Sequence, residues 1–250
     1  MIATVASSDI AKNAEAALDR DWLSKWVQPQ HLTSSALAGY QEAYASHPAS
    51  TLRLPQILRP EIMRYLFLYM SSEAEYEPIF GLYSPDAKVP EQEWLAAEDS
   101  NRMYQFSQMR GTRPDVRSLN PFLFAKFREA LCDARFLLFF QALTGTPLAP
   151  LKSFAGNAFG TGDYLRPHHD FVGNRRIAYI FYLTPKWSPG FGGALHMFSH
   201  DNHETVLEVE DNSLVVFDVH GHREHYVAPV CEAAGEYRRL TLGGWFDNAA

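Results

Sequence analysis

The chain has 250 residues, 46% of them hydrophobic and 14% aromatic, which is enough to bury a sizeable core. Its net charge is −7 and it has no run of Lys or Arg, so nucleic acid and anionic membrane surfaces are not expected partners. Its two cysteines, Cys132 and Cys231, fit neither a disulfide framework nor a zinc pattern. With no basic leader and no apolar run of membrane-spanning length, we expect a cytoplasmic protein.

The first 150 residues are predicted to be mainly helical and to support the rest of the chain. Helical patterns cover residues 8–18, 58–70, 118–131 and 133–145. Pro60 suits a first helical turn, Asp133 is a candidate N-terminal cap and Gly145 is a candidate stop. Cys132 lies in an apolar helical pattern and is expected in the core. Between residues 73 and 111 the pattern is weak, which predicts loops with short helices.

After Pro150 the pattern changes to short β-prone runs separated by turn residues. Eight such runs lie within residues 152–159, 163–171, 175–184, 193–198, 205–210, 213–219, 224–230 and 238–246. They predict an antiparallel double-sheet jelly roll. Because no repeat or linker separates the halves, we expect one α+β domain over residues 1–250. Residues 151–250 would form its jelly-roll (double-stranded β-helix) core, with the helical N-terminal half packed on it.

The stretch YLRPHHDF, residues 164–171, is a candidate metal site. Side chains alternate along a strand, so His168 and Asp170 share a face while His169 points the other way. By itself this pair is more often a surface salt link. A third ligand is available from His220, His222 or His225, which follow an apolar run. Two histidines and one carboxylate with open positions opposite form the facial triad of non-haem Fe(II) oxygenases.

Six segments in order carry a family resemblance: YLRPHHD, RRIAYIFYLTPKW, FGGALHMF, LVVFDV, HYVAPV and RRLTLGGWF. The region from residue 156 to 246 resembles the 2-oxoglutarate- and Fe(II)-dependent oxygenases of the prolyl hydroxylase type. Residues 54–67 and 122–145 resemble the helices that precede the core in that family. The resemblance therefore extends over most of the chain and is dense only in the last third.

The resemblance implies Fe(II), the co-substrates 2-oxoglutarate and O₂, and ascorbate as a possible accessory reductant. It assigns His168 and Asp170 as metal ligands. It favours His225 as the third ligand, because the family histidine is followed by any residue and then valine, here Tyr226 and Val227. His222 remains the main alternative.

The resemblance also implies an anchor for the far carboxylate of 2-oxoglutarate. Arg239 matches the family arginine, and Thr241 matches the hydroxyl residue two positions later; Tyr182 matches a tyrosine that binds the same carboxylate. On a strand, Arg239, Thr241 and Trp245 share one face, and Leu240, Leu242 and Phe246 share the other. The chain departs from the family at Phe159, where several relatives have a tyrosine, and we expect Asn157 to be a substitute contact.

The expected activity is a dioxygenase reaction that hydroxylates an unactivated C–H bond, most simply in a prolyl or related amino-acid unit of a peptide or small molecule. Substrate-side candidates are Trp245, Tyr164, His169 and Arg176. One alternative is a natural-product tailoring oxygenase that acts on a free or carrier-bound amino acid. Alternatives from other classes are a zinc hydrolase and a non-catalytic metal-binding jelly-roll protein.

Overall fold

The computed structural model describes residues 6–151, 154–220 and 224–249. The helices in these ranges are α1 (Ser7–Ala16), α2 (Arg20–Leu23), α3 (Ser34–Ser46), α4 (Pro60–Leu68), α5 (Glu91–Ala96), α6 (Asn120–Leu131) and α7 (Ala134–Thr144). The strands are β1 (Thr51–Leu54), β2 (Ala74–Leu82), β3 (Ala87–Val89), β4 (Arg102–Thr112), β5 (Ala155–Phe159), β6 (Tyr164–His168), β7 (Arg175–Tyr182), β8 (Leu195–Phe198), β9 (Glu204–Leu207), β10 (Ser213–Asp218), β11 (His225–Val227) and β12 (Arg239–Asp247).

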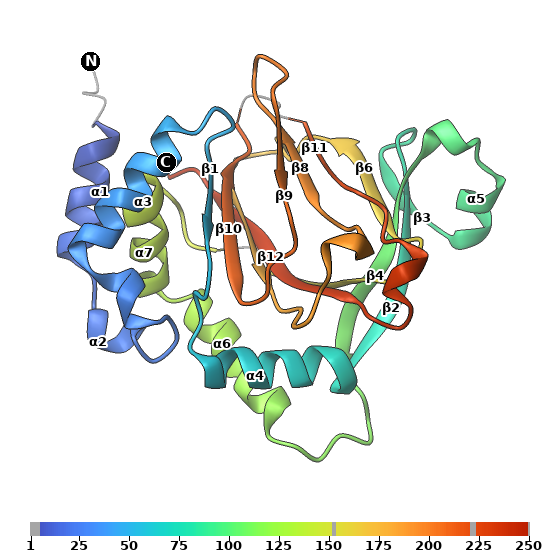
Figure 1. The fold of residues 1–250 in the computed structure, drawn as a ribbon, viewed down its shortest axis with the longest axis horizontal. Coiled ribbons are helices and arrows are strands. Elements are labelled where there is room, and N and C mark those ends of the chain that lie inside the picture. Colours follow the sequence, from blue (N-terminus) through green and yellow to red (C-terminus); the bar gives the residue numbers. More distant parts are fainter. Residues whose placement is uncertain (1–5, 152–153, 221–223, 250) are drawn as a thin grey trace.

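The strands form one curled antiparallel sheet with helices on its outer side (Figure 1). Its main path runs β1-β10-β7-β12-β5-β4-β6-β11-β8-β9, and β2 and β3 extend it beside β4. All eight predicted runs after residue 150 contain a strand. The predicted α+β class is therefore confirmed.

The helix α7 shows how local sequence sets the support layer. Asp133 accepts a hydrogen bond from the Arg135 backbone N–H at 2.9 Å, which satisfies a donor at the helix start. Gly145 ends the helix with φ of 62°, and a Cβ there would lie 2.6 Å from the Ser7 carbonyl oxygen. Both predicted helix signals are confirmed.

Two apolar cores lie on opposite faces of the sheet. The larger core packs α7 and its neighbours against one face of β12 through Leu240, Leu242 and Phe246. The smaller core lies inside the curl and includes Tyr182 and Phe217. Because strand side chains alternate, β12 serves both: its other face carries Arg239 into the curl. The predicted division of β12 into two faces is confirmed.

The prediction of loops with short helices between residues 73 and 111 is correct for the short helix α5 but wrong for most of the region. This region contains β2, β3 and β4, and β4 pairs with both β5 and β6 in the middle of the sheet. All residues of β4 except Arg110 and Thr112 are half-buried, and polar side chains occur on both of its faces. The apolar alternation by which a strand is recognised is therefore weak. The first 150 residues thus supply strands of the sheet as well as helices.

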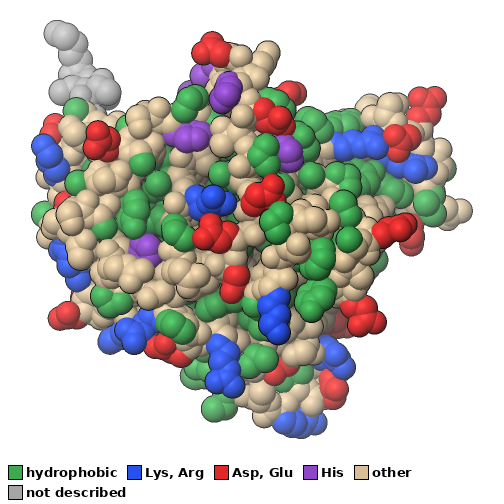
Figure 2. Space-filling view, viewed as in Figure 1, with side chains coloured by type: hydrophobic (Ala, Val, Ile, Leu, Met, Phe, Trp, Pro, Cys, Tyr) green, Lys and Arg blue, Asp and Glu red, His purple; other side chains and the backbone are tan. Residues whose placement is uncertain are grey.

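Cys132 also differs from its prediction, because it follows the end of α6 and is exposed. None of the helices within the described ranges has the length and apolar character that a membrane crossing requires. On the face shown in Figure 2, acidic and basic side chains are interspersed and do not gather into one large patch of either sign.

Candidate metal centre

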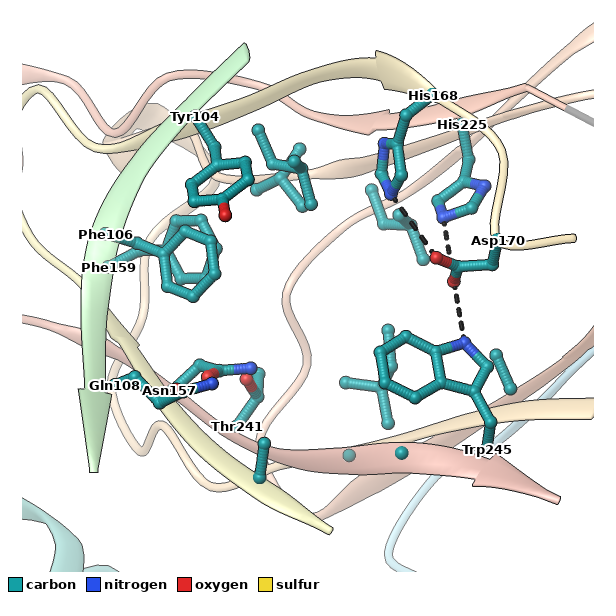
Figure 3. Close-up of a pocket in the computed structure, with 18 of the residues that line it drawn as sticks. Tyr104, Phe106, Gln108, Asn157, Phe159, His168, Asp170, His225, Thr241 and Trp245 are labelled. Atoms are coloured by element: carbon teal, nitrogen blue, oxygen red, sulfur yellow. Dashed lines mark hydrogen bonds and ion pairs between the residues drawn. The ribbon is translucent and has the colours of Figure 1, made fainter. Parts of the chain in front are cut away.

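His168, Asp170 and His225 converge at one side of the curl, as Figure 3 shows. One ligand atom from each lies within 4.8 Å of the others. The Nε2 atom of His168 lies 3.6 Å from Asp170 Oδ1, and the Nε2 atom of His225 lies 3.4 Å from Asp170 Oδ2. Within the described residues, this is the one group of three such side chains with metal-binding spacing. Two imidazoles and one carboxylate suit a divalent transition metal.

Strand pairing brings the two histidines together. His168 is the last residue of β6 and His225 is the first of β11, and the two are direct partners in the antiparallel register. Their ring centroids lie 4.3 Å apart. Asp170 follows two residues after His168 and lies just beyond the end of β6, and its side chain faces that of His168, as predicted. His222, the alternative third ligand, lies outside the described residues.

The surroundings keep His168 ready to bind a metal. Its Nδ1 lies 3.0 Å from the Arg166 carbonyl oxygen, which can only accept, so Nδ1 carries the hydrogen. Burial lowers the pKa of His168 to about 4, and the adjacent His225 acts in the same direction. The ring is therefore neutral near pH 7, with the lone pair of Nε2 facing Asp170.

Asp170 is held ionised. Burial would raise its pKa, but hydrogen bonding and charge from His225, the charge of His168 and the indole of Trp245 together hold the pKa well below its ordinary range. The indole Nε1 of Trp245 donates to Asp170 Oδ2 at 2.9 Å. A neutral imidazole and a carboxylate are the forms that coordinate metals.

A cavity of about 470 Å³ opens beside the three side chains. One wall holds the metal-centre residues and Trp245, and the opposite wall holds Tyr104, Phe106, Gln108, Asn157 and Phe159 (Figure 3). Arg239, Thr241, Gly243 and Trp245 of β12 also line it. A volume of this size accommodates a small dicarboxylic acid together with part of a second molecule.

Arg239 is the only buried cation among the cavity-lining residues, with 2% of its surface exposed. Its Nη2 donates to the Tyr182 hydroxyl at 3.1 Å. Its guanidinium lies between the rings of Phe159 and Tyr182, 4.9 Å from each centroid. Its Nε is buried and has no hydrogen-bond partner in the described part of the chain. A buried unpaired donor on a cation is a site for an anionic ligand.

The other predicted anchor residues lie beside Arg239. Tyr182 is fully buried and is not a cavity-lining residue, so within the described structure its hydroxyl serves Arg239. Thr241 lines the cavity and pairs in register with Asn157 on β5. The Oδ1 atom of Asn157 is buried without a partner in the described residues. Phe159 stacks on Phe106 with centroids 4.6 Å apart.

Of the four substrate-side candidates, Trp245 lines the cavity and the other three do not. Tyr164 packs against a separate apolar cluster beside α5, and His169 is exposed. Arg176 forms an ion pair with Asp218 at 3.0 Å. Its neighbour Arg175 lines the cavity instead, with its guanidinium 3.8 Å from the ring centroid of Trp245.

The sequence analysis did not predict that Arg175 and residues of β4 would line the cavity. Arg175 faces the cavity because the pairing of β7 with β12 shifts register between Phe246 and Asp247, which inserts an extra residue opposite Asp247. Nothing in the local pattern signals that bulge. The β4 residues Tyr104, Phe106 and Gln108 alternate by two, and that spacing was the available signal.

Residues 154–247 match the model of a family described as the 2OG-Fe(II) oxygenase superfamily. The chain is 29% identical over 159 residues to prolyl 3-hydroxylase OGFOD1 of Mus musculus and 31% identical over 161 residues to that of Xenopus laevis. Both alignments cover 60% of this chain, but only 27% and 29% of those proteins. The match therefore spans less than a third of either relative.

The fold is similar to the crystal structure of a Pseudomonas putida prolyl-4-hydroxylase, with a TM-score of 0.58 and 22% sequence identity. That similarity covers 86% of this chain and 100% of the other. It confirms the predicted jelly-roll architecture. The sequence matches confirm the predicted resemblance to oxygenases of the prolyl hydroxylase type.

Proposed function

We propose that this chain is a dioxygenase that hydroxylates an unactivated C–H bond of a prolyl or related amino-acid unit, because residues 154–247 match the model of the 2OG-Fe(II) oxygenase superfamily. The observation that carries the proposal is the cavity that joins a His-Asp-His group at one side to a buried arginine with an unpaired donor. We propose that residues 1–250 act as a single oxygenase domain.

His168, Asp170 and His225 would hold Fe(II). Their donor set fits that ion, because two neutral imidazoles and one carboxylate leave coordination positions open toward the cavity. When bound, Fe(II) supplies the redox chemistry by which O₂ is divided between the substrate C–H bond and 2-oxoglutarate, giving an alcohol, succinate and CO₂. Ascorbate is a possible accessory reductant in this proposal.

Arg239 would bind the far carboxylate of 2-oxoglutarate. The buried Nε has no partner within the described residues, and a carboxylate would supply the missing acceptor together with a compensating charge. Tyr182 fixes the guanidinium through its hydroxyl, and the rings on either side restrict its orientation. Thr241 lines the path between this anchor and the metal centre and offers a hydroxyl to the bound acid.

The prolyl assignment rests on the two relatives named prolyl 3-hydroxylase. Aromatic side chains on both walls of the cavity support it, because Tyr104 and Phe106 on one side and Trp245 on the other offer apolar ring faces to a compact ring such as that of proline. A peptide substrate leaves its chain outside the cavity and inserts one side chain. We therefore propose a prolyl residue of a peptide or protein as the substrate, with the hydroxylated carbon to be read from the product.

The proposal is tested by turnover with proline-containing peptides under Fe(II), 2-oxoglutarate and O₂. We expect succinate release coupled to addition of one oxygen atom to a prolyl residue, measured by mass spectrometry, with loss of both signals in His168→Ala. Oxidation of free or carrier-bound amino acids without hydroxylation of peptides would instead indicate a natural-product tailoring oxygenase. Metal binding without succinate release from any of these substrates would contradict the enzymatic function.

A further inference from the structure

Asp170 lies outside the strand that precedes it. The last backbone pair of β6 joins His168 to His225, and Asp170 follows in a segment without strand pairing. Its orientation therefore depends on side-chain contacts more than that of the two histidines does. A metal-ligating carboxylate needs such contacts, because a carboxylate that is free to rotate can offer either oxygen or both.

The contact that meets this need comes from a tryptophan 75 residues later in the sequence. Trp245 Nε1 donates to Asp170 Oδ2 at 2.9 Å, the length of a charge-assisted hydrogen bond. The dashed line in Figure 3 shows the indole reaching the carboxylate from below while the histidines approach from above. Each carboxylate oxygen also faces one histidine, since Oδ2 lies 3.4 Å from His225 Nε2 and Oδ1 lies 3.6 Å from His168 Nε2.

The indole is itself fixed on two sides. Trp245 lies in β12 and pairs in register with Ala178 of the neighbouring strand β7. The Arg175 guanidinium lies 3.8 Å from its ring centroid, which is close stacking for a cation on an aromatic face. A hydrogen-bond donor placed on a paired strand and stacked in this way is preorganised, so it loses little freedom when it orients a ligand.

We propose that Trp245 is a positioning residue that holds Oδ2 of Asp170 and so fixes the orientation of the carboxylate beside the two histidines. This inference rests on the proposed function, because it assumes that Asp170 is a ligand. Its consequence is that a metal would meet a carboxylate whose orientation is already fixed, so binding would not have to order a freely rotating ligand.

The chain offers a matched pair of variants for the test. Trp245→Phe removes the indole N–H and keeps an aromatic ring. Trp187→Phe makes the same change at another half-buried tryptophan, whose Nε1 donates to the Gly192 carbonyl at 3.0 Å and which does not line the cavity. Comparing the full-length variants separates loss of this one donor from the general effect of replacing tryptophan.

The readouts are the dissociation constant for Co(II), measured without co-substrate, and the visible spectrum of the bound Co(II), which reports coordination number. We expect Trp245→Phe to weaken Co(II) binding by about 10- to 100-fold and to change the spectrum. Trp187→Phe should match the wild-type protein in both. Thermal unfolding of the metal-free variants identifies any loss that is due to packing alone.

Wild-type affinity and an unchanged spectrum in Trp245→Phe would overturn the inference while leaving the proposed function intact. A changed spectrum in Trp245→Phe, together with wild-type protein that binds Co(II) but never releases succinate, would retain the inference and overturn the enzymatic function. Wild-type protein that binds no divalent metal would overturn both.

Discussion

Arg239 and Tyr182 form a buried pair in which the arginine Nη2 donates to the tyrosine hydroxyl at 3.1 Å. The pair leaves the arginine Nε without a partner in the described structure, although both side chains are almost completely buried. A buried guanidinium without a carboxylate is costly, and its retention here is explained if a ligand carboxylate completes it.

Replacing Arg239 with lysine should weaken binding of 2-oxoglutarate to the metal-loaded protein. Lysine keeps the charge but loses the planar fork, so about 1.5–3 kcal/mol of charged hydrogen bonding is lost, or roughly a 10- to 100-fold rise in the dissociation constant. Titration calorimetry under anaerobic conditions measures it. Arg238→Lys is the control, because the Arg238 guanidinium lies over Tyr76, 4.7 Å from the ring centroid. Equal effects in both variants would contradict the anchor.

Removing the Tyr182 hydroxyl should act through Arg239. Tyr182→Phe keeps the ring and deletes one hydrogen bond to a charged group, so we expect a several-fold loss of 2-oxoglutarate affinity. Because the hydroxyl contacts the arginine, its effect should be smaller when Arg239 is already lysine. A double-variant cycle with Arg239→Lys gives the coupling. Strictly additive effects would show that the hydroxyl acts independently of the guanidinium.

The helical layer should contribute to stability without contacting the site. Phe140 of α7 is fully buried, with its ring 4.7 Å from that of Phe246 on β12 and 5.5 Å from that of Tyr179 on β7. Phe140→Ala should therefore cost about 3–5 kcal/mol in the free energy of unfolding. Phe122→Ala, at a ring that is 58% exposed on α6, should change it by less than about 0.5 kcal/mol. Denaturant unfolding distinguishes the two, and similar losses would contradict the packing.

Acid should destabilise the N-terminal layer through His31. Its Nδ1 lies 2.7 Å from the Tyr40 hydroxyl and its Nε2 lies 3.1 Å from the Gln56 carbonyl oxygen. Burial lowers the pKa of His31 below the ordinary value of 6.5. The unfolded chain therefore takes up this proton first. The contribution of neutral His31 to the free energy of unfolding is therefore complete above pH 6.5. It is lost as the pH falls through the lower pKa that this histidine has in the folded protein.

His31→Gln should accordingly flatten the dependence of unfolding free energy on pH below 6.5, even if the variant is less stable at neutral pH. His203→Gln, at an exposed position, serves as the control and should keep the wild-type slope. Parallel slopes for wild type and His31→Gln would remove this histidine from the acid response.

Local alternation explains how much of the site was predictable. The two faces of β12 follow from strand geometry and were read from sequence. The pairing of His168 with Asp170 was also read as strand alternation, although β6 ends at His168 and Asp170 lies just beyond it. The Trp245–Asp170 hydrogen bond was not predicted, because it joins positions 75 residues apart whose proximity depends on the completed sheet. Arg175 lines the cavity in place of the predicted Arg176, and this difference depends on a single β-bulge. The cavity-lining residues of β4 were not predicted because a half-buried strand with polar side chains on both faces lacks the usual alternation of apolar and polar residues.

The most direct test of the central claim is anaerobic absorbance of the purified protein with Fe(II) and 2-oxoglutarate. The account predicts the weak visible charge-transfer band of the iron–2-oxo acid chelate in the wild-type protein. It predicts loss of that band in Asp170→Ala and weakening in Arg239→Ala at the same co-substrate concentration. Absence of the band in wild-type protein that demonstrably holds iron would contradict the account.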